Sequence, residues 1–155
     1  MSISRSDFLN RISQYCAENE KSTHDVLAKL KAWNVPSEEI NDILNKLRSE
    51  KFLDDTRYAK TYASEKWNLD KWGKIKIRLS LEQKMIDENM IEDALAMIND
   101  EDYIAGLHEL LRNKLREVKS DDPANDAKRA MMFAASRGFE EELIEEWLEK
   151  YGYDL

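Results

Sequence analysis

The stretch Val35-Pro-Ser-Glu-Glu-Ile-Asn-Asp-Ile-Leu-Asn-Lys-Leu47 decides the fold, because the same pattern returns twice further along the chain. Its apolar residues recur three or four positions apart, as they do on one face of a helix. A shift of 51 residues places the pattern on residues 86–98, and a further shift of 53 places it on residues 139–151. A repeat of about 50 residues buries too little apolar surface to be stable alone, so we expect neighbouring repeats to stack.

The repetition predicts an all-α fold of three tandem three-helix repeats that form an elongated, curved, solenoid-like body. The chain of 155 residues contains only four Gly and two Pro, which favours helices joined by short connections. The predicted repeats form one continuous structural unit and occupy residues 1–52, 53–101 and 102–155.

Several predicted helix ends carry characteristic residues. Ser22 followed by Asp25 resembles a capping box at the start of a helix. Asp122 precedes Pro123, the order expected of an N-cap and the first helical position. Gly138 fits the left-handed turn that commonly ends a helix.

Charge is distributed unevenly along this acidic chain, whose formal net charge is −8. Residues 1–50 contain 7 Lys and Arg against 8 Asp and Glu, a balance of −1. Residues 51–84 contain 9 against 5, a balance of +4, and residues 85–155 contain 8 against 19, a balance of −11. The middle third can therefore face an anionic surface that would repel the last third.

Few residues have the spacing of a catalytic or metal site. The single cysteine, Cys16, lies in a helix-like apolar run, so we expect a packed and unreactive side chain. His24 and His108 have no partner at metal-ligand spacing. We therefore expect no catalytic residue, metal or cofactor. The start of the chain lacks the features of a signal peptide, and no apolar run is long enough to span a membrane, so we expect a cytoplasmic protein.

Asp54 and Asp55 are better explained as helix-capping residues than as paired catalytic carboxylates, because they stand at the start of a predicted helix. Arg57 is expected either to pair with these two acids or to reach a partner.

The most basic segment is predicted to form a helix over residues 73–84. One side of that helix and of the turn before it would carry Lys71, Lys74 and Arg78. Another side would carry Ile75, Leu79 and Ile86. The basic side is either a solvated face or a contact with an acidic protein surface or with DNA phosphates. Trp67 and Trp72 could stack on exposed bases, although packing at a helix junction is the favoured interpretation.

Three stretches of sequence form a recognisable set. They are Phe52-Leu-Asp-Asp-Thr-Arg-Tyr-Ala59, then Trp72-Gly-Lys-Ile-Lys-Ile-Arg78 with Leu81, Lys84 and Ile86, and Arg137-Gly-Phe139 with Leu143 and Ile144. These stretches resemble the RecX family of regulatory proteins, which modulate the RecA recombinase. Their order and spacing also match, and the resemblance extends over residues 14–152. Met85 stands where the family usually has Gly, so we expect the turn before Ile86 to close differently.

The resemblance implies a non-enzymatic regulator in DNA repair, homologous recombination and the SOS response. Family members lodge in the groove of the recombinase filament on single-stranded DNA. There they inhibit its ATP hydrolysis, strand exchange and co-protease activity. We therefore expect a monomer that binds the RecA-type filament, with single-stranded DNA in the filament as a further candidate partner. The candidate partner-binding residues are Arg57, Lys71, Trp72, Lys74, Lys76, Arg78 and Lys84.

Two other functions remain open. Triplets of short helices also occur in helix-turn-helix DNA-binding proteins, although only residues 73–84 offer the basic residues that a recognition helix needs. A helical-repeat adaptor for an unrelated protein is the second alternative.

Overall fold

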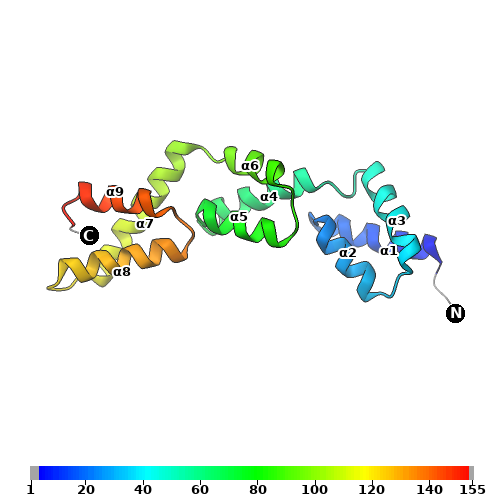
Figure 1. The fold of residues 1–155 in the computed structure, drawn as a ribbon, viewed down its shortest axis with the longest axis horizontal. Helices are drawn as coiled ribbons and strands as arrows, with labels where there is room; N and C mark the ends of the chain where they lie inside the picture. The colour runs from blue at the N-terminus through cyan, green and yellow to red at the C-terminus, as the bar shows by residue number, and fades with distance from the viewer. Residues whose placement is uncertain (1–3, 154–155) are drawn as a thin grey trace. The chain divides into compact units, whose positions relative to one another are not determined.

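The computed structural model describes residues 4–153, which contain nine α-helices and no β-strand (Figure 1). The predicted all-α fold is therefore confirmed. The helices are α1 Arg5–Glu18, α2 Thr23–Ala32, α3 Ser37–Ser49, α4 Asp55–Asn68, α5 Lys74–Gln83, α6 Glu88–Ala96, α7 Asp100–Val118, α8 Pro123–Ser136 and α9 Glu141–Lys150.

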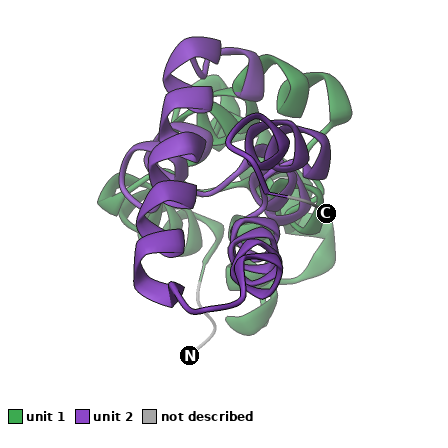
Figure 2. Cartoon of the chain, turned by 90° about the vertical axis from the view of Figure 1, so that its left-hand side faces the viewer, with its two compact units in different colours: residues 1–62, 81–94 green, residues 63–80, 95–155 purple. Residues whose placement is uncertain are grey.

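The chain divides into two compact units (Figure 2). Unit 1 consists of residues 1–62 and 81–94, and unit 2 consists of residues 63–80 and 95–155. The division passes through α4 and α6 and through α5 near its end, so the middle helices contribute residues to both units. The boundaries of the three sequence repeats remain a prediction.

Unit 1 is built on α1, α2 and α3, whose apolar residues form one cluster. Ile12, Leu30 and Leu47, one from each helix, have no solvent exposure. Both α1 and α2 begin with a capping box, and the box at Ser22 and Asp25 is the one that the sequence predicts. Burying such helix faces supplies most of the stability of helices this short.

Unit 2 contains α7, α8 and α9, with Leu111, Ala134 and Ile144 fully buried. Asp122 caps α8 by accepting a hydrogen bond from the Asn125 N–H at 3.2 Å, and Pro123 stands at the first turn. Both features are predicted from the sequence. The small Ala134 on the buried face of α8 lets neighbouring backbones approach closely.

The turn between the second and third helix of each predicted repeat closes in the same way. Asn34, Met85 and Gly138 have positive φ values of 59°, 58° and 94°. In each turn the next N–H donates to the carbonyl five residues back. The three bonds are Val35 to Leu30 at 3.1 Å, Ile86 to Leu81 at 3.2 Å and Phe139 to Ala134 at 3.2 Å. These are the bonds of a Schellman motif.

The expectation that Met85 changes its turn is therefore wrong. Met85 adopts the left-handed conformation that Gly138 adopts at the corresponding position, and its side chain is 78% exposed. Because an L-residue in this conformation is strained by roughly 1–2 kcal/mol, the turn keeps its geometry at the expense of stability.

Several residues considered for chemistry are packed in the interior instead. Cys16 is buried, and burial raises the pKa of its thiol, which disfavours the reactive thiolate. Trp67 is also buried, in agreement with the favoured interpretation that it packs at a helix junction.

Within residues 4–153, no group of three or more His, Cys, Asp or Glu residues has a geometry that could hold a metal ion. None of the helices described is both long and apolar enough to cross a membrane.

Candidate interaction surface around helix α5

The start of α5 is held by backbone contacts from another part of unit 2. The Gly73 N–H donates to the Arg137 carbonyl at 2.7 Å, and the Ile75 N–H donates to the Gly138 carbonyl at 3.0 Å. Two of the three sequence stretches that carry the family resemblance thus meet through their main chains. The first four N–H groups of a helix have no partner within the helix and can bind an anion. Because two such groups already donate to carbonyl oxygens here, few remain for an external anion.

Gly73 is required by the closeness of this contact. A Cβ atom there would lie 2.2 Å from the carbonyl carbon and oxygen of Gly138 and 2.4 Å from the Phe139 nitrogen. These contacts are with backbone atoms, which cannot rotate aside. The Arg137 guanidinium adds a hydrogen bond to the Asp70 carbonyl in the loop before α5.

Tyr103 of α7 supports the same helix start from the side. Its hydroxyl accepts a hydrogen bond from the Lys74 N–H at 2.9 Å and donates one to the Glu140 carboxylate. Burial raises the pKa of the Tyr103 phenol, and the bond to Glu140 raises it further, so the hydroxyl remains a donor. The basic helix is therefore fixed in place by a network that reaches α7 and the start of α9.

The buried face of α5 differs from the expected one. Ile77 and Leu81 have no solvent exposure, whereas Ile75 is 45% exposed and Leu79 is 53% exposed. The sequence groups Ile75 and Leu79 with buried Ile86, but helical spacing from Gly73 puts Ile77 and Leu81 on the core side. Two large apolar side chains consequently lie on the outer face of the most basic helix.

Lys76 lies against Trp72. Its ammonium nitrogen is 4.3 Å from the indole centroid, and the Lys66 ammonium is 4.6 Å from the same ring. Such cation–π contacts contribute roughly 0.5–1 kcal/mol each at exposed sites. The half-buried Trp72 ring is thus occupied by two ammonium groups of its own chain, which weakens the interpretation that it stacks on bases.

Lys71 and Lys74 lie against a pair of neighbouring rings. The Lys71 ammonium is 4.6 Å from the Trp67 centroid, and the Lys74 ammonium is 4.8 Å from that of Tyr103. The two rings are themselves 5.2 Å apart. An Asp100 carboxylate oxygen lies 3.7 Å from the Lys74 ammonium nitrogen. Further along α5, Arg78 is half-buried. Unit 2 therefore brings together the aromatic and basic residues that the sequence selects in and before this helix.

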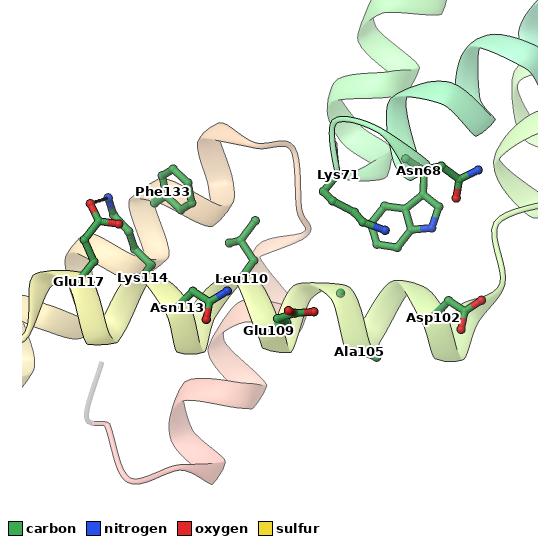
Figure 3. Close-up of a pocket in the computed structure, with 12 residues that line it drawn as sticks. Asn68, Lys71, Asp102, Ala105, Glu109, Leu110, Asn113, Lys114, Glu117 and Phe133 are labelled. Carbon is green, nitrogen blue, oxygen red and sulfur yellow. Dashed lines mark hydrogen bonds and ion pairs between the residues drawn. The ribbon is translucent and has the colours of Figure 1, made fainter.

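A groove runs along α7 beside these residues (Figure 3). It has a volume of about 640 Å³. Its apolar surface comes from Trp67, Leu110 and Phe133, and carboxylates such as Glu109 line it on the α7 side. Lys71 extends over this groove, as the close-up shows. The repeat pattern contains no signal for such a groove, because it forms between helices distant in sequence.

Arg57 and Lys84, both in unit 1, have acidic partners within the chain. The Arg57 Nε lies 2.6 Å from the Glu20 carboxylate, and its guanidinium also donates to the Lys51 carbonyl at 3.1 Å. Of the two expectations for Arg57, side-chain pairing with Asp54 and Asp55 is therefore wrong, and contact with a partner stays a prediction. Asp54 instead caps α4, accepting from the Arg57 N–H at 3.1 Å.

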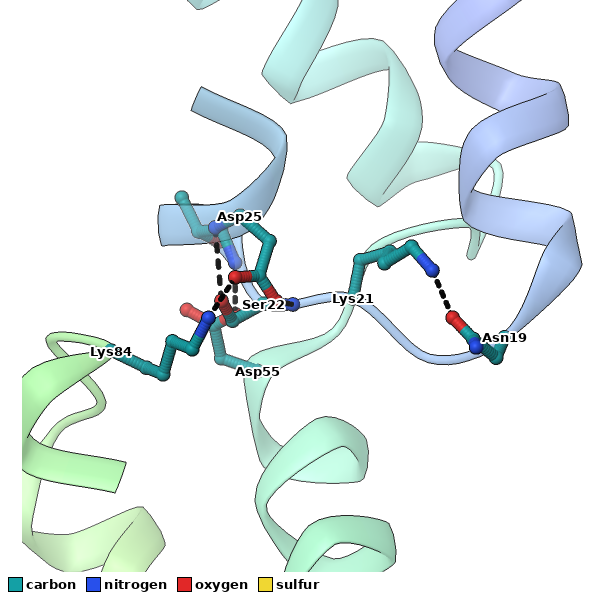
Figure 4. A network of polar contacts seen from close by, with 7 residues as sticks. Asn19, Lys21, Ser22, Asp25, Asp55 and Lys84 are labelled. Atoms are coloured by element: carbon teal, nitrogen blue, oxygen red, sulfur yellow. Dashed lines mark hydrogen bonds and ion pairs between the residues drawn. The ribbon is translucent and has the colours of Figure 1, made fainter. Parts of the chain in front are cut away.

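Lys84 forms an ion pair with Asp25 of the α2 capping box (Figure 4). Burial raises the pKa of Asp25, but hydrogen bonds from Lys84 and Ser22 outweigh it and hold the pKa below its usual value. Asp55 bonds to the main chain nearby, accepting from the Thr23 N–H at 2.7 Å. Lys84 thus pairs with a carboxylate of the capping box that begins α2. Sequence spacing alone does not reveal this pair.

These features define a class of protein. It is an all-helical protein of repeated three-helix motifs whose most basic helix carries exposed apolar side chains and begins beside the rings of Trp72 and Tyr103.

The comparisons with known proteins give the particular family. A family model described as RecX, second three-helix domain, matches residues 54–95. The regulatory protein RecX of Pseudomonas entomophila (strain L48) is 30% identical over 128 residues, covering 83% of this chain and 81% of that protein. The chain belongs to the RecX family.

Other relatives differ in length. The regulatory protein RecX of Limosilactobacillus reuteri (strain DSM 20016) is 29% identical over 136 residues, covering 88% of this chain and 52% of that protein. The chain thus spans about half the length of this relative and of the RecX of Geobacillus kaustophilus, where the share is 48%.

Solved structures share the fold. A crystal structure of regulatory protein RecX has a TM-score of 0.85 at 26% identity, covering 94% of this chain and 73% of that one. A crystal structure of RecX from Lactobacillus salivarius has a TM-score of 0.86 at 24% identity, covering 94% of this chain and 95% of that one.

Proposed function

We propose that this chain is a non-enzymatic regulator that binds a RecA-type recombinase filament on single-stranded DNA. Binding in the filament groove would inhibit ATP hydrolysis, strand exchange and co-protease activity. The observation that carries the proposal is membership of a family whose relatives are named regulatory protein RecX. The proposal includes action as a monomer in the cytoplasm.

The charge distribution supports a protein partner or a nucleoprotein partner more than free DNA. A protein with a net charge of −8 is repelled by an isolated duplex at long range. Its local excess of +4 over residues 51–84 can still bind an acidic surface that is presented at close range. A filament offers both acidic protein and DNA phosphates.

The candidate residues should differ in importance. Arg57 and Lys84 are ion-paired within unit 1, so an external partner would have to compete with Glu20 and Asp25. Lys76 lies on an aromatic ring, and a cation in that position retains its charge for a partner. We propose that Lys71, Trp72, Lys74, Lys76 and Arg78 supply the principal contacts.

The proposal is tested by titrating this protein into a RecA-type recombinase while following ATP hydrolysis that depends on single-stranded DNA. Inhibition at well below one protein per recombinase subunit is expected, because one bound molecule would affect a stretch of filament. Absence of inhibition together with absence of filament binding at equimolar protein would refute the proposal and favour the adaptor. Tight duplex binding measured in parallel would favour the helix-turn-helix alternative.

A further inference from the structure

Helix α5 has two apolar faces. Its inner face carries Ile77 and Leu81, which are fully buried. Its outer face carries the half-exposed Ile75 and Leu79, and half-buried Trp72 lies three residues before Ile75. Ile75 and Leu79 stand at positions i and i+4 of α5, on one stripe of the helix, and this spacing is among those with which helices anchor in apolar grooves.

The repeat shifts of 51 and 53 residues make α2 and α8 the counterparts of α5. These two helices show that the fold does not need a large apolar stripe on the outer face. Counterparts of Ile77 and Leu81 are buried apolar residues in α2 and α8 alike. These are Val26 and Leu30 in α2, and Ala130 and Ala134 in α8, all with no exposure. By contrast, the counterparts of Ile75 and Leu79 are His24 and Ala28 in α2, and Lys128 and Met132 in α8, none of which is buried. Stability therefore explains the inner face of α5 and leaves its outer face without a structural reason.

The charges around the outer stripe indicate what it contacts. Lys76 lies within the stripe, next to Trp72, and Arg78 precedes Leu79. A phosphate backbone would use the cations but would gain little from two aliphatic side chains, since phosphates and sugars offer mainly polar contacts. A protein groove with an apolar floor and an acidic rim would use both.

We propose that α5 docks by Ile75 and Leu79 into an apolar, acid-rimmed groove of a partner protein, with Lys76 and Arg78 facing the acidic rim. The inference rests on the proposed function in taking that partner to be the recombinase. It assigns the main contact of this helix to recombinase protein and not to DNA in the filament. Ile75 and Leu79 become binding anchors, a role that the sequence alone does not assign to them.

The test compares the full chain with its Ile75→Ser/Leu79→Ser variant. Binding is measured to RecA-type filaments assembled with a non-hydrolysable ATP analogue on single-stranded DNA, and separately to the same DNA without recombinase. Leu69→Ser is the matched control, because Leu69 is 78% exposed and lies in the loop before α5. Thermal unfolding verifies that each variant is folded, and Leu79→Ser alone replaces the double variant if the latter is not.

We expect the double variant to bind filaments at least tenfold more weakly, with a similar loss at low and at high salt, because the lost contact is apolar. Leu69→Ser should bind filaments as the unmodified chain does. Filament affinity within twofold of that chain for the double variant would overturn the proposal. An equal loss of binding to DNA alone would also overturn it, in favour of a nucleic-acid contact. Failure of the unmodified chain to bind filaments would refute the proposed function, and this inference with it.

Discussion

Replacing Gly73 by Ala tests the contact that holds the start of α5. The added Cβ would lie 2.2 Å from the Gly138 carbonyl group and 2.4 Å from the Phe139 nitrogen. Relief of this clash requires the two backbone segments to separate. Separation would break the Gly73 to Arg137 bond of 2.7 Å and the Ile75 to Gly138 bond of 3.0 Å.

The expected loss of stability follows from these contacts. Two hydrogen bonds contribute about 1 kcal/mol each, and overpacking adds about 1–3 kcal/mol. The Gly73→Ala variant should therefore lose about 3–5 kcal/mol of unfolding free energy. For a chain of this length, each kcal/mol lowers the melting temperature by roughly 2–4 °C, so a fall of about 10 °C is expected.

The measurement is urea and thermal unfolding followed by far-ultraviolet circular dichroism. Gly152→Ala is the control, because Gly152 has a φ of 87° but a Cβ atom added there would meet no other atom within 4 Å. It should lose only about 1 kcal/mol, from backbone strain alone. A loss for Gly73→Ala no larger than that of Gly152→Ala would refute the argument that these loops are in direct backbone contact.

Three further predictions concern single residues. Met85→Gly should gain about 0.5–1 kcal/mol of unfolding free energy in urea melts, because relief of left-handed strain exceeds the added chain entropy, whereas Met85→Ala should gain nothing. Burial raises the pKa of Asp25, but the hydrogen bonds from Lys84 and Ser22 together hold it below its usual value. The resulting stabilisation is complete above the unfolded pKa of about 4 and is lost as the pH falls through the folded value. Asp25→Asn should thus lose about 1 kcal/mol at neutral pH, and an equal loss at pH 3 would contradict this sign. Tyr103→Phe should lose about 1–3 kcal/mol and speed amide exchange at Lys74, and unchanged exchange would contradict the hydrogen bond.

Much of the fold follows from local sequence. The spacing of apolar residues and the capping signals at Ser22, Asp122 and Gly138 predict helices that the structure confirms. These signals are short-range, because a cap and an amphipathic face depend on residues within a few turns. At Met85 the residue type predicts a changed turn, but the structure keeps the left-handed turn, because the surrounding chain imposes a conformation that a residue with a side chain disfavours.

The candidate site is only partly predictable. The sequence selects the basic segment, but it groups Ile75 and Leu79 with buried Ile86, because an apolar residue on a helix can belong to either of two faces. For Arg57 it offers its acidic neighbours in sequence or an external partner, whereas the structure pairs the side chain with Glu20. Ion pairs across 37 positions depend on how helices pack, and no periodicity encodes them.

The sequence by itself determined the helical class, the repetition and the uneven charge, because each is fixed by residue type and spacing along the chain. Only the tertiary structure decided which charges are neutralised internally, which face of α5 is buried and why Gly73 must be glycine. Those properties arise where segments such as residues 70–75 and 137–140 meet in space. Contacts between distant segments depend on packing, which spacing in one dimension does not specify.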